Sequence, residues 1–310
     1  MNSGFNFVEM KKLIKRILFS IPPVKHVIEE RDRYKTYHPP GHYYSPIPNK
    51  EEVKKDEKRI FDRSANEIGG IDLKENVQME LLESFLGFYS ELPFPENKSD
   101  NYRYWMNNEL YSYSDGIMLY CMIRQLKPAK LIEAGSGFSS AVTLDTNEKF
   151  LNNKMECTFI EPFPVQFNQL VKKFPVNYKL LSSRIQDVPL DEFRKLNAND
   201  ILFIDSTHVS KTGSDVNYIL FEILPILRQG VYIHFHDIFY PFEYPVEWVY
   251  KGFAWNECYL LKAFLQYNDH FEIILFNTFM EQFHQDWFTE NMPLCLKNTG
   301  GSLWIRKNKQ

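Results

Sequence analysis

Two short stretches of the sequence combine carboxylates with imidazoles. FIDSTH places Asp205 three residues before His208, and HFHD places His236 directly before Asp237. An imidazole titrates near neutral pH and suits a general base. Carboxylates at the ends of neighbouring strands suit Mg²⁺, which lowers the pKa of an acceptor hydroxyl and orients it. Two interpretations therefore stay open: His208 or His236 is a base, or Asp205 and Asp237 are metal ligands.

The sequence LIEAGSGFSS predicts a cofactor-binding turn between a strand and a helix. Gly135 and Gly137 supply backbone freedom on either side of Ser136, and the helix that follows can point its first amides at an anion or a nucleotide. Glu133 lies at the tip of the strand, where it can hold a cationic group of a cofactor. Ser140 stands where a dinucleotide fold has its third glycine.

Further polar residues follow the next predicted strands. Glu161 ends the second strand, where a carboxylate can accept hydrogen bonds from both ribose hydroxyls of a nucleoside. Gln186 and Asp187 follow the third strand, where a polar side chain can meet an adenine edge. Asp205 ends the fourth strand, and its carboxylate is expected to point into the same cleft.

The elements that must position these residues alternate between short apolar runs and helical periods. Strands are predicted at 131–134, 157–161, 178–182, 201–205, 230–236, 271–276 and 302–306. One helix is predicted from the glycine turn to about residue 150. Further helices are predicted at 164–174, 189–196, 214–228 and 255–267. This alternation predicts a parallel sheet covered on both faces. We expect no clear amphipathic helix before the last strand, which can then lie antiparallel. The predicted fold class is α/β, with a Rossmann-like, seven-stranded, mostly parallel sheet.

The first part of the chain predicts a helical, loop-rich extension over residues 1–113, followed by a cofactor-binding domain over 114–310. Helices are expected at 7–19, 24–34, 50–63, 75–90 and 114–126. The segment YHPPGHYYSPIP contains four prolines and a glycine, so it must be a loop. Its aromatic rings indicate either a lid over the main domain or a connector packed by its own side chains.

Charge and cysteine usage exclude some functions. Residues 1–63 carry 14 basic and 9 acidic side chains, whereas the rest of the chain carries 22 and 31. Nucleic acid is therefore not expected as a partner of the main domain. The four cysteines lack metal-ligand spacing and are expected to be buried free thiols in a reducing compartment.

The sequence predicts a cytoplasmic protein, because it has neither a signal peptide nor an apolar run of membrane-spanning length. Residues 7–19 nevertheless predict an amphipathic helix with a basic face. This helix can lie on the anionic inner face of a membrane, or dock on the protein itself or on a neighbouring subunit of a homo-oligomer.

The succession EAGSG, IEP, IQD, FIDSTH and HFHD resembles the class I S-adenosylmethionine-dependent methyltransferases, over roughly residues 115–306. YHPPGHYYSP, GSDVN and HDIFYPFEYP resemble blocks of a bacterial group of this family that is often found among polysaccharide and secondary-metabolite genes. The resemblance implies that Glu133, Gly135 and Gly137 form the first cofactor motif, with Glu133 reaching the methionine ammonium. It also implies that Glu161 binds the ribose and that Asp187 lies beside the adenine.

The resemblance implies that the protein catalyses methyl transfer. Methyl transfer is an in-line displacement, so the enzyme must position its substrates and remove a proton if the acceptor is a hydroxyl. O-methylation of a small-molecule or glycan acceptor is expected, with rings of FYPFEYP, Tyr43, Tyr44 and Trp255 as candidate pocket walls. Several related O-methyltransferases hold a metal with carboxylates at these strand ends. The alternatives are a nicotinamide-dependent oxidoreductase and a non-catalytic binding subunit that keeps the fold.

Overall fold

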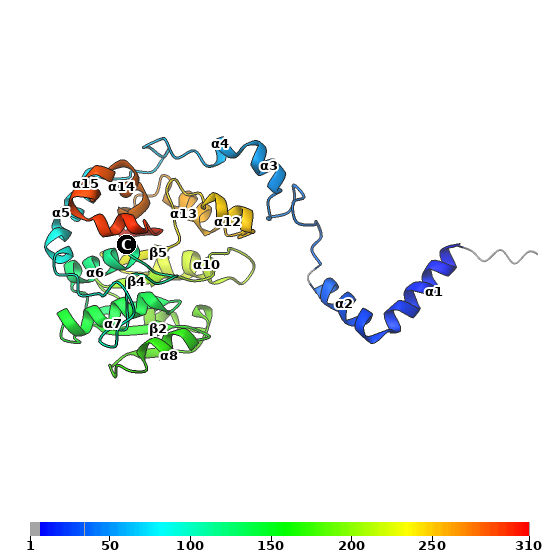
Figure 1. The fold of residues 1–310 in the computed structure, drawn as a ribbon, viewed down its shortest axis with the longest axis horizontal. Coiled ribbons are helices and arrows are strands. Elements are labelled where there is room, and N and C mark those ends of the chain that lie inside the picture. Colours follow the sequence, from blue (N-terminus) through cyan, green and yellow to red (C-terminus); the bar gives the residue numbers. More distant parts are fainter. Residues whose placement is uncertain (1–6, 34, 310) are drawn as a thin grey trace, which may run out of the picture. The chain divides into compact units, whose positions relative to one another are not determined.

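The computed structural model describes residues 7–33 and 35–309, without the side chains of residues 7–9, 18–19, 28 and 31–33. The chain forms two compact units, Met1–Glu57 and Lys58–Gln310 (Figure 1). The second unit contains the whole sheet and also residues 58–113. The predicted boundary between residues 113 and 114 remains a prediction.

The second unit is built on a seven-stranded sheet with the order β3-β2-β1-β4-β5-β7-β6. Strands β1 to β5 run parallel, and β7 runs antiparallel to both of its neighbours, β5 and β6. The strands are β1 Lys130–Ala134, β2 Glu156–Ile160, β3 Lys179–Leu181, β4 Ile201–Ile204, β5 Tyr232–His236, β6 Phe271–Phe276 and β7 Ser302–Lys307. The predicted fold class is confirmed.

The register of the central strands brings the predicted site residues to one edge of the sheet. Ala134 at the end of β1 pairs with Ile160 of β2 and with Ile204 of β4, and Ile204 pairs with Phe235 of β5. Strands β4 and β5 are buried along their whole length, which explains their nearly continuous apolar sequences. The residues that follow these strand ends are therefore neighbours.

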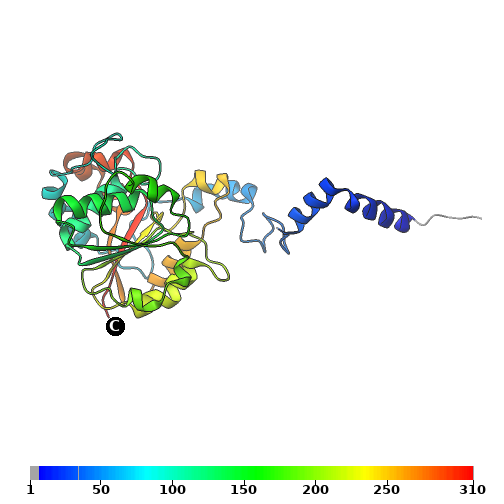
Figure 2. The same cartoon turned by 90° about the horizontal axis from the view of Figure 1, so that it is seen from below.

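Helices cover both sides of the sheet (Figure 2). In this unit they are α4 Glu57–Ile60, α5 Glu75–Tyr89, α6 Ser114–Leu126, α7 Phe138–Phe150, α8 Val165–Val171, α9 Leu190–Phe193, α10 Asp215–Tyr218, α11 Leu224–Ile226, α12 Val246–Lys251, α13 Glu257–Leu265, α14 Asn277–Phe283 and α15 Gln285–Asn291. Short 3₁₀ turns occur at Ile185–Asp187 and Pro293–Lys297, and a π-helical turn at Ile219–Ile223 joins α10 to α11. The four cysteines are buried free thiols, as predicted.

The connection between β6 and β7 contains two short helices that were not predicted. We expected no clear amphipathic helix there, and α14 and α15 occupy most of it. The first five residues of α14 are all buried, so its sequence shows no alternation between an apolar and a polar face. Helix α12 was also not predicted, and the single helix expected at 50–63 is divided into α3 Lys50–Lys55 and α4.

The first unit contains the helices α1 Phe7–Ser20, α2 Pro22–Arg33 and α3. The proline-rich segment is a loop, as predicted, in which the rings of His38 and His42 stack at 4.3 Å and those of Tyr43 and Tyr44 lie 4.4 Å apart. These rings contact one another within the loop, and the predicted lid over the main domain remains a prediction. No helix of the described chain is long and apolar enough to cross a membrane.

Candidate active site

Two adjoining hollows lie at the carboxyl edge of the sheet, with volumes of about 500 Å³ and about 150 Å³. Gly135, Glu161 and Asp205 line both of them. The larger hollow is also lined by Phe163, Arg184, Gln186, Thr207, Lys211 and Asp215, and the smaller one by Leu110, Tyr111, Ser136, Gly137 and Gln166. The glycine turn thus borders both hollows.

The glycine turn requires glycine at its first position. Gly135 has a φ of +85°, and a Cβ atom there would lie 1.7 Å from the carbonyl oxygen of Asp205. No other residue fits this approach between the β1 and β4 strand ends. The turn leads directly into α7, whose first residue is Phe138.

Glu133 lies beneath the turn, where it is fully buried. Its Oε1 accepts hydrogen bonds from the hydroxyls of Ser139 at 2.6 Å and Ser140 at 2.7 Å, and its Oε2 has no partner among the described residues. Ser140 also accepts a hydrogen bond from the amide of Gly137 at 3.1 Å, so it stabilises the helix start in place of the third glycine. Burial raises the pKa of Glu133 to about 8, despite the hydrogen bonds from both serines.

Glu161 and the 3₁₀ turn after β3 border the larger hollow. Glu161 accepts hydrogen bonds from the amides of Ser136 at 3.2 Å and Phe163 at 2.8 Å, which orient its carboxylate at the strand tip. Asp187 forms a two-point ion pair with Arg184, at 2.9 and 2.8 Å. Its neighbour Gln186 lines the hollow instead, so only one of the two candidates for the adenine edge borders it.

Three candidate catalytic residues converge beside the hollows. Nε2 of His208 lies 3.5 Å from Oδ1 of Asp205 and 3.6 Å from Oδ2 of Asp237. One ligand atom from each residue lies within 4.8 Å of the other two. His208 and Asp237 both have a positive φ, 58° and 56°, which is uncommon for non-glycine residues in general and less so for His and Asp. The two predicted metal ligands thus lie together with a predicted base.

Glu257, which was not predicted as a site residue, contacts Nδ1 of His208. Its Oε2 lies 2.9 Å from Nδ1 of His208, and the amides of Asn256 and Glu257 donate to the carbonyl oxygen of His208 at 3.0 and 3.1 Å. Glu257 is fully buried in the first turn of α13. With a proton on Nδ1 directed at Glu257, Nε2 faces the two aspartates. The only indication in the sequence was a carboxylate at the start of a helix rich in apolar residues.

His236 lies on the other side of Asp237, with its Nε2 3.5 Å from Oδ1 of that residue. The ring of Tyr111 lies 5.0 Å from the His236 ring, and Tyr111 also lines the smaller hollow. His234 lies on the same face of β5 as His236, as predicted, but it is fully buried and stacks on Phe203 at 4.0 Å. Burial holds the pKa of His234 well below its ordinary value, so it stays neutral.

The cluster couples several titratable groups at close range. Burial by itself would lower the pKa of His208, but Asp205 and Glu257 outweigh it and raise this pKa well above its ordinary value. Burial also tends to raise the pKa of Asp205, whereas His236 and His208 bring it below its ordinary value. The pKa of Asp237 is raised, chiefly by burial. The carboxylates Asp205, Asp237 and Glu257 thus surround the imidazole of His208, and this environment favours its protonated, cationic form.

Aromatic side chains continue from His208 toward the solvent. The Trp255 ring lies 4.5 Å from the His208 ring, stacks on Phe253 at 5.0 Å and meets Trp248 edge-on at 5.3 Å. Phe253 is exposed, and Trp248 and Trp255 are half-buried. We call Trp248, Phe253 and Trp255 the aromatic wall. The four rings of FYPFEYP are all buried, which favours the alternative that they form part of an aromatic core over the alternative that they line a pocket.

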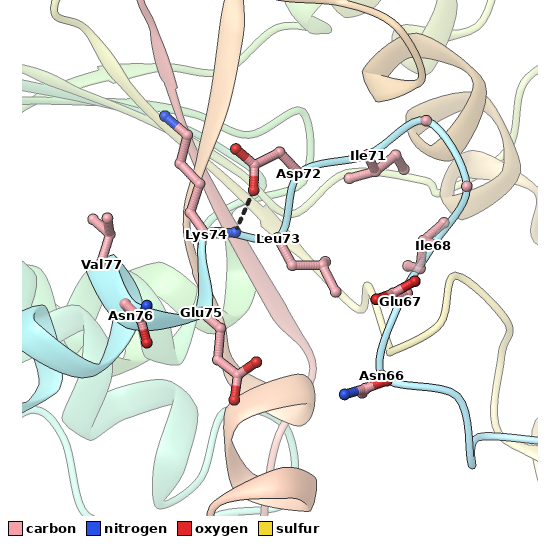
Figure 3. Close-up of a pocket in the computed structure, with 12 residues that line it drawn as sticks. Asn66, Glu67, Ile68, Ile71, Asp72, Leu73, Lys74, Glu75, Asn76 and Val77 are labelled. Atoms are coloured by element: carbon pink, nitrogen blue, oxygen red, sulfur yellow. Dashed lines mark hydrogen bonds between the residues drawn. The ribbon is translucent and has the colours of Figure 1, made fainter.

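Another hollow, of about 730 Å³, is lined by the consecutive residues 66–77 (Figure 3). The amide of Lys74 donates to Oδ1 of Asp72 at 3.0 Å, which holds the loop before α5. None of the residues predicted for chemistry lines this hollow. It is therefore not a candidate active site.

The sequence matches the family described as "Methyltransferase domain" over residues 132–238. This match begins in β1 and ends just after Asp237, so it spans the glycine turn, Glu161 and the cluster. Residues 132–238 thus form a methyltransferase domain, which supports a class I S-adenosylmethionine-dependent methyltransferase. A methyltransferase domain favours S-adenosylmethionine over a nicotinamide as the cofactor.

Other proteins are similar to this methyltransferase over much of its length. An uncharacterized protein of Archaeoglobus fulgidus is 40% identical over 179 residues, which cover 56% of this chain and 80% of the relative. The S-adenosylhomocysteine-bound methyltransferase PaMTH1 of Podospora anserina is 14% identical, with a TM-score of 0.42 and coverage of 84% and 97% of the two chains. The O-methyltransferase TomG of Streptomyces achromogenes, in complex with S-adenosylmethionine, is 12% identical, with a TM-score of 0.40 and coverage of 83% and 96%.

Proposed function

We propose that this methyltransferase methylates a hydroxyl of a small-molecule or carbohydrate-like acceptor, and that Asp205, His208 and Asp237 hold a divalent cation such as Mg²⁺. The convergence of these three side chains, with ligand atoms within 4.8 Å of one another, carries the proposal. Asp205 also lines both hollows, so the cluster adjoins the space that we assign to S-adenosylmethionine.

The donor set fits such a cation. Two carboxylates and one imidazole combine the oxygen ligands that Mg²⁺ and Mn²⁺ prefer with one nitrogen ligand. The separations of 3.5 and 3.6 Å between Nε2 of His208 and the aspartate oxygens exceed a hydrogen bond and surround a common point. A bound cation would lower the pKa of the acceptor hydroxyl and fix its orientation.

The remaining residues position the two substrates. S-adenosylmethionine supplies the methyl group, and the glycine turn with Glu161 is suited to its methionine and ribose portions. As the acceptor oxygen gives up its proton, to solvent in the metal mechanism, and bonds to the methyl carbon, the carbon–sulfur bond breaks and S-adenosylhomocysteine leaves. Asp205 belongs to the cluster and also lines the hollows proposed for S-adenosylmethionine. The acceptor hydroxyl must lie near Asp205 for an in-line transfer. The aromatic wall offers flat apolar faces for a sugar or an aromatic ring.

A second mechanism rests on the contact between Glu257 and His208. In it, Nε2 of His208 takes the hydroxyl proton, and Glu257 stabilises the imidazolium that forms. Because the neighbouring carboxylates raise the pKa of His208, this mechanism requires His208 to lose its own proton first. This mechanism needs no metal. The two mechanisms therefore differ in their response to metal removal.

Direct measurement of Mn²⁺ binding by electron paramagnetic resonance tests the metal site without knowledge of the acceptor. We expect Asp237→Asn to weaken Mn²⁺ binding by at least about tenfold, because it removes a carboxylate ligand, while calorimetry shows unchanged binding of S-adenosylhomocysteine. Asp191→Asn is the matched control, since Asp191 is exposed and lies outside the cluster.

Turnover is then measured with a panel of hydroxyl acceptors, as release of S-adenosylhomocysteine with and without a chelator. Metal-dependent turnover is expected. Equal Mn²⁺ binding by the wild type and Asp237→Asn, together with turnover that resists the chelator, would refute the metal and favour His208 as the base.

A further inference from the structure

Helix α1 has one apolar face, which is exposed in the structure. The apolar side chains recur at intervals of three and four residues, which places them on one side of a helix. They are between 42% and 55% exposed. This face consists of Met10, Leu13, Ile14, Ile17 and Ile21, the last of which directly follows the helix.

The opposite side of α1 is basic. At 100° per residue, its basic side chains lie away from the apolar stripe on the remaining surface of the helix. They are Lys11, Lys12, Lys15 and Arg16. Glu9 is the one acidic residue in the sequence of α1, so the helix carries a net positive charge.

Helix α2 has a different charge pattern. Lys25 lies 3.7 Å from Glu29, and His26 lies 3.9 Å from Glu30, both one turn apart. The sequence PPVKHVIEERDR contains three basic residues other than histidine and three acidic residues, so α2 balances its charge internally. Of these two helices, only α1 carries an excess of positive charge, and it also carries the exposed apolar face.

A helix with this division of side chains suits the interface of an anionic bilayer. Its 14 residues correspond to about 21 Å, which is too short to cross a hydrocarbon core of about 30 Å. Lying in the plane of the interface, it can bury its apolar face among the acyl chains while lysine and arginine contact anionic headgroups. An apolar groove on another protein would cover the apolar face but would not require the basic one.

We propose that α1 anchors the enzyme on the surface of a bilayer that contains anionic lipids, with the face formed by Met10, Leu13, Ile14, Ile17 and Ile21 inserted. The partner is lipid with a negatively charged headgroup. The anchor is independent of the reaction proposed above, since it uses none of the residues of the candidate active site. It would keep the enzyme beside acceptors that are themselves attached to lipid.

Co-sedimentation of the full chain with vesicles tests the proposal. The vesicles contain phosphatidylcholine alone or phosphatidylcholine with phosphatidylglycerol. We expect binding to the anionic vesicles that weakens with added salt, because the screening length falls as ionic strength rises. Lys12→Gln combined with Arg16→Gln should weaken this binding by about fivefold for each charge removed.

Two further double variants distinguish the faces. Leu13→Gln combined with Ile17→Gln should weaken vesicle binding by at least about tenfold, because it removes apolar surface from the inserted face. Lys25→Gln combined with Glu29→Gln, on α2, keeps the net charge and should bind as the wild type does. Unchanged binding of S-adenosylhomocysteine shows that the second unit of each variant is folded.

The proposal is overturned if the full chain does not sediment with anionic vesicles, or if it binds neutral vesicles equally well. Sedimentation velocity identifies the competing occupant of the face. Concentration-dependent self-association that Leu13→Gln with Ile17→Gln abolishes, without binding to vesicles, would assign this face to a second copy of the chain.

Discussion

Replacing Glu133 by Gln should change how the stability of the fold depends on pH. Gln has nearly the shape of a protonated Glu and can still accept the hydrogen bonds from Ser139 and Ser140 through one oxygen. It cannot ionise. The difference between the wild type and this variant therefore isolates the titration of one buried carboxyl.

The size of the effect follows from the pKa of Glu133, which burial raises from 4.5 to about 8. The folded state thus retains a proton that the unfolded chain releases near pH 4.5. A group with a raised pKa in the folded state stabilises the fold fully below the unfolded pKa, and this stabilisation is lost as pH rises toward the folded pKa. At pH 7 the loss is on the order of 3 kcal/mol relative to pH 4.5.

Urea denaturation at several pH values between 5 and 7.5 measures this difference. We expect Glu133→Gln to approach the wild type in stability at pH 5 and to exceed it by about 2–3 kcal/mol near pH 7. Glu83→Gln is the matched control, because Glu83 is exposed on α5 and solvated in both states. A constant difference between Glu133→Gln and the wild type over this range would refute the reasoning.

Three further substitutions test the metal site, the glycine turn and a buried ion pair. Glu257→Gln should lower Mn²⁺ affinity by about 10- to 100-fold and leave S-adenosylhomocysteine binding unchanged, because the partner that orients His208 is weakened; equal Mn²⁺ affinity by electron paramagnetic resonance would contradict this. Gly135→Ala should abolish S-adenosylhomocysteine binding in calorimetry and destabilise the fold by about 3 kcal/mol, since its Cβ would collide with backbone at a positive φ; a variant that binds normally would show that the turn can relax. Arg103→Leu should cost about 3–5 kcal/mol in urea denaturation, because it leaves Asp145 buried without the partner that lies 2.6 Å from it; a loss below about 1 kcal/mol would mean that Asp145 is otherwise satisfied.

The sheet and the convergence at its edge could be predicted because they depend on short-range patterns. Each central strand is a brief apolar run, and parallel pairing places the ends of β1, β4 and β5 at one edge. Asp205 and Asp237 follow two such ends directly. Their proximity therefore follows from the order of the strands.

The contact between His208 and Glu257 could not be predicted in this way. The two residues are 49 positions apart, and Glu257 comes from a helix whose placement depends on packing against the sheet. The hydrogen bonds from Ser139 and Ser140 to Glu133 had a local signal, since two serines open the helix that follows an acidic strand end. Helix α14 was missed because burial of its first five residues, polar ones included, removes the period that marks a surface helix, and α15 is only seven residues long.

The antiparallel strand β7 also constrains the order in which the protein can form. It lies between β5 and β6, although it is the last strand to leave the ribosome. Until residues 302–307 have been made, β6 has no strand beside it, and β5 exposes the edge next to His236. Unpaired strand edges make partly folded chains prone to aggregation. The nascent chain therefore covers these edges of β5 and β6 only after residues 302–307 are available, and premature termination before residue 302 would leave both edges open.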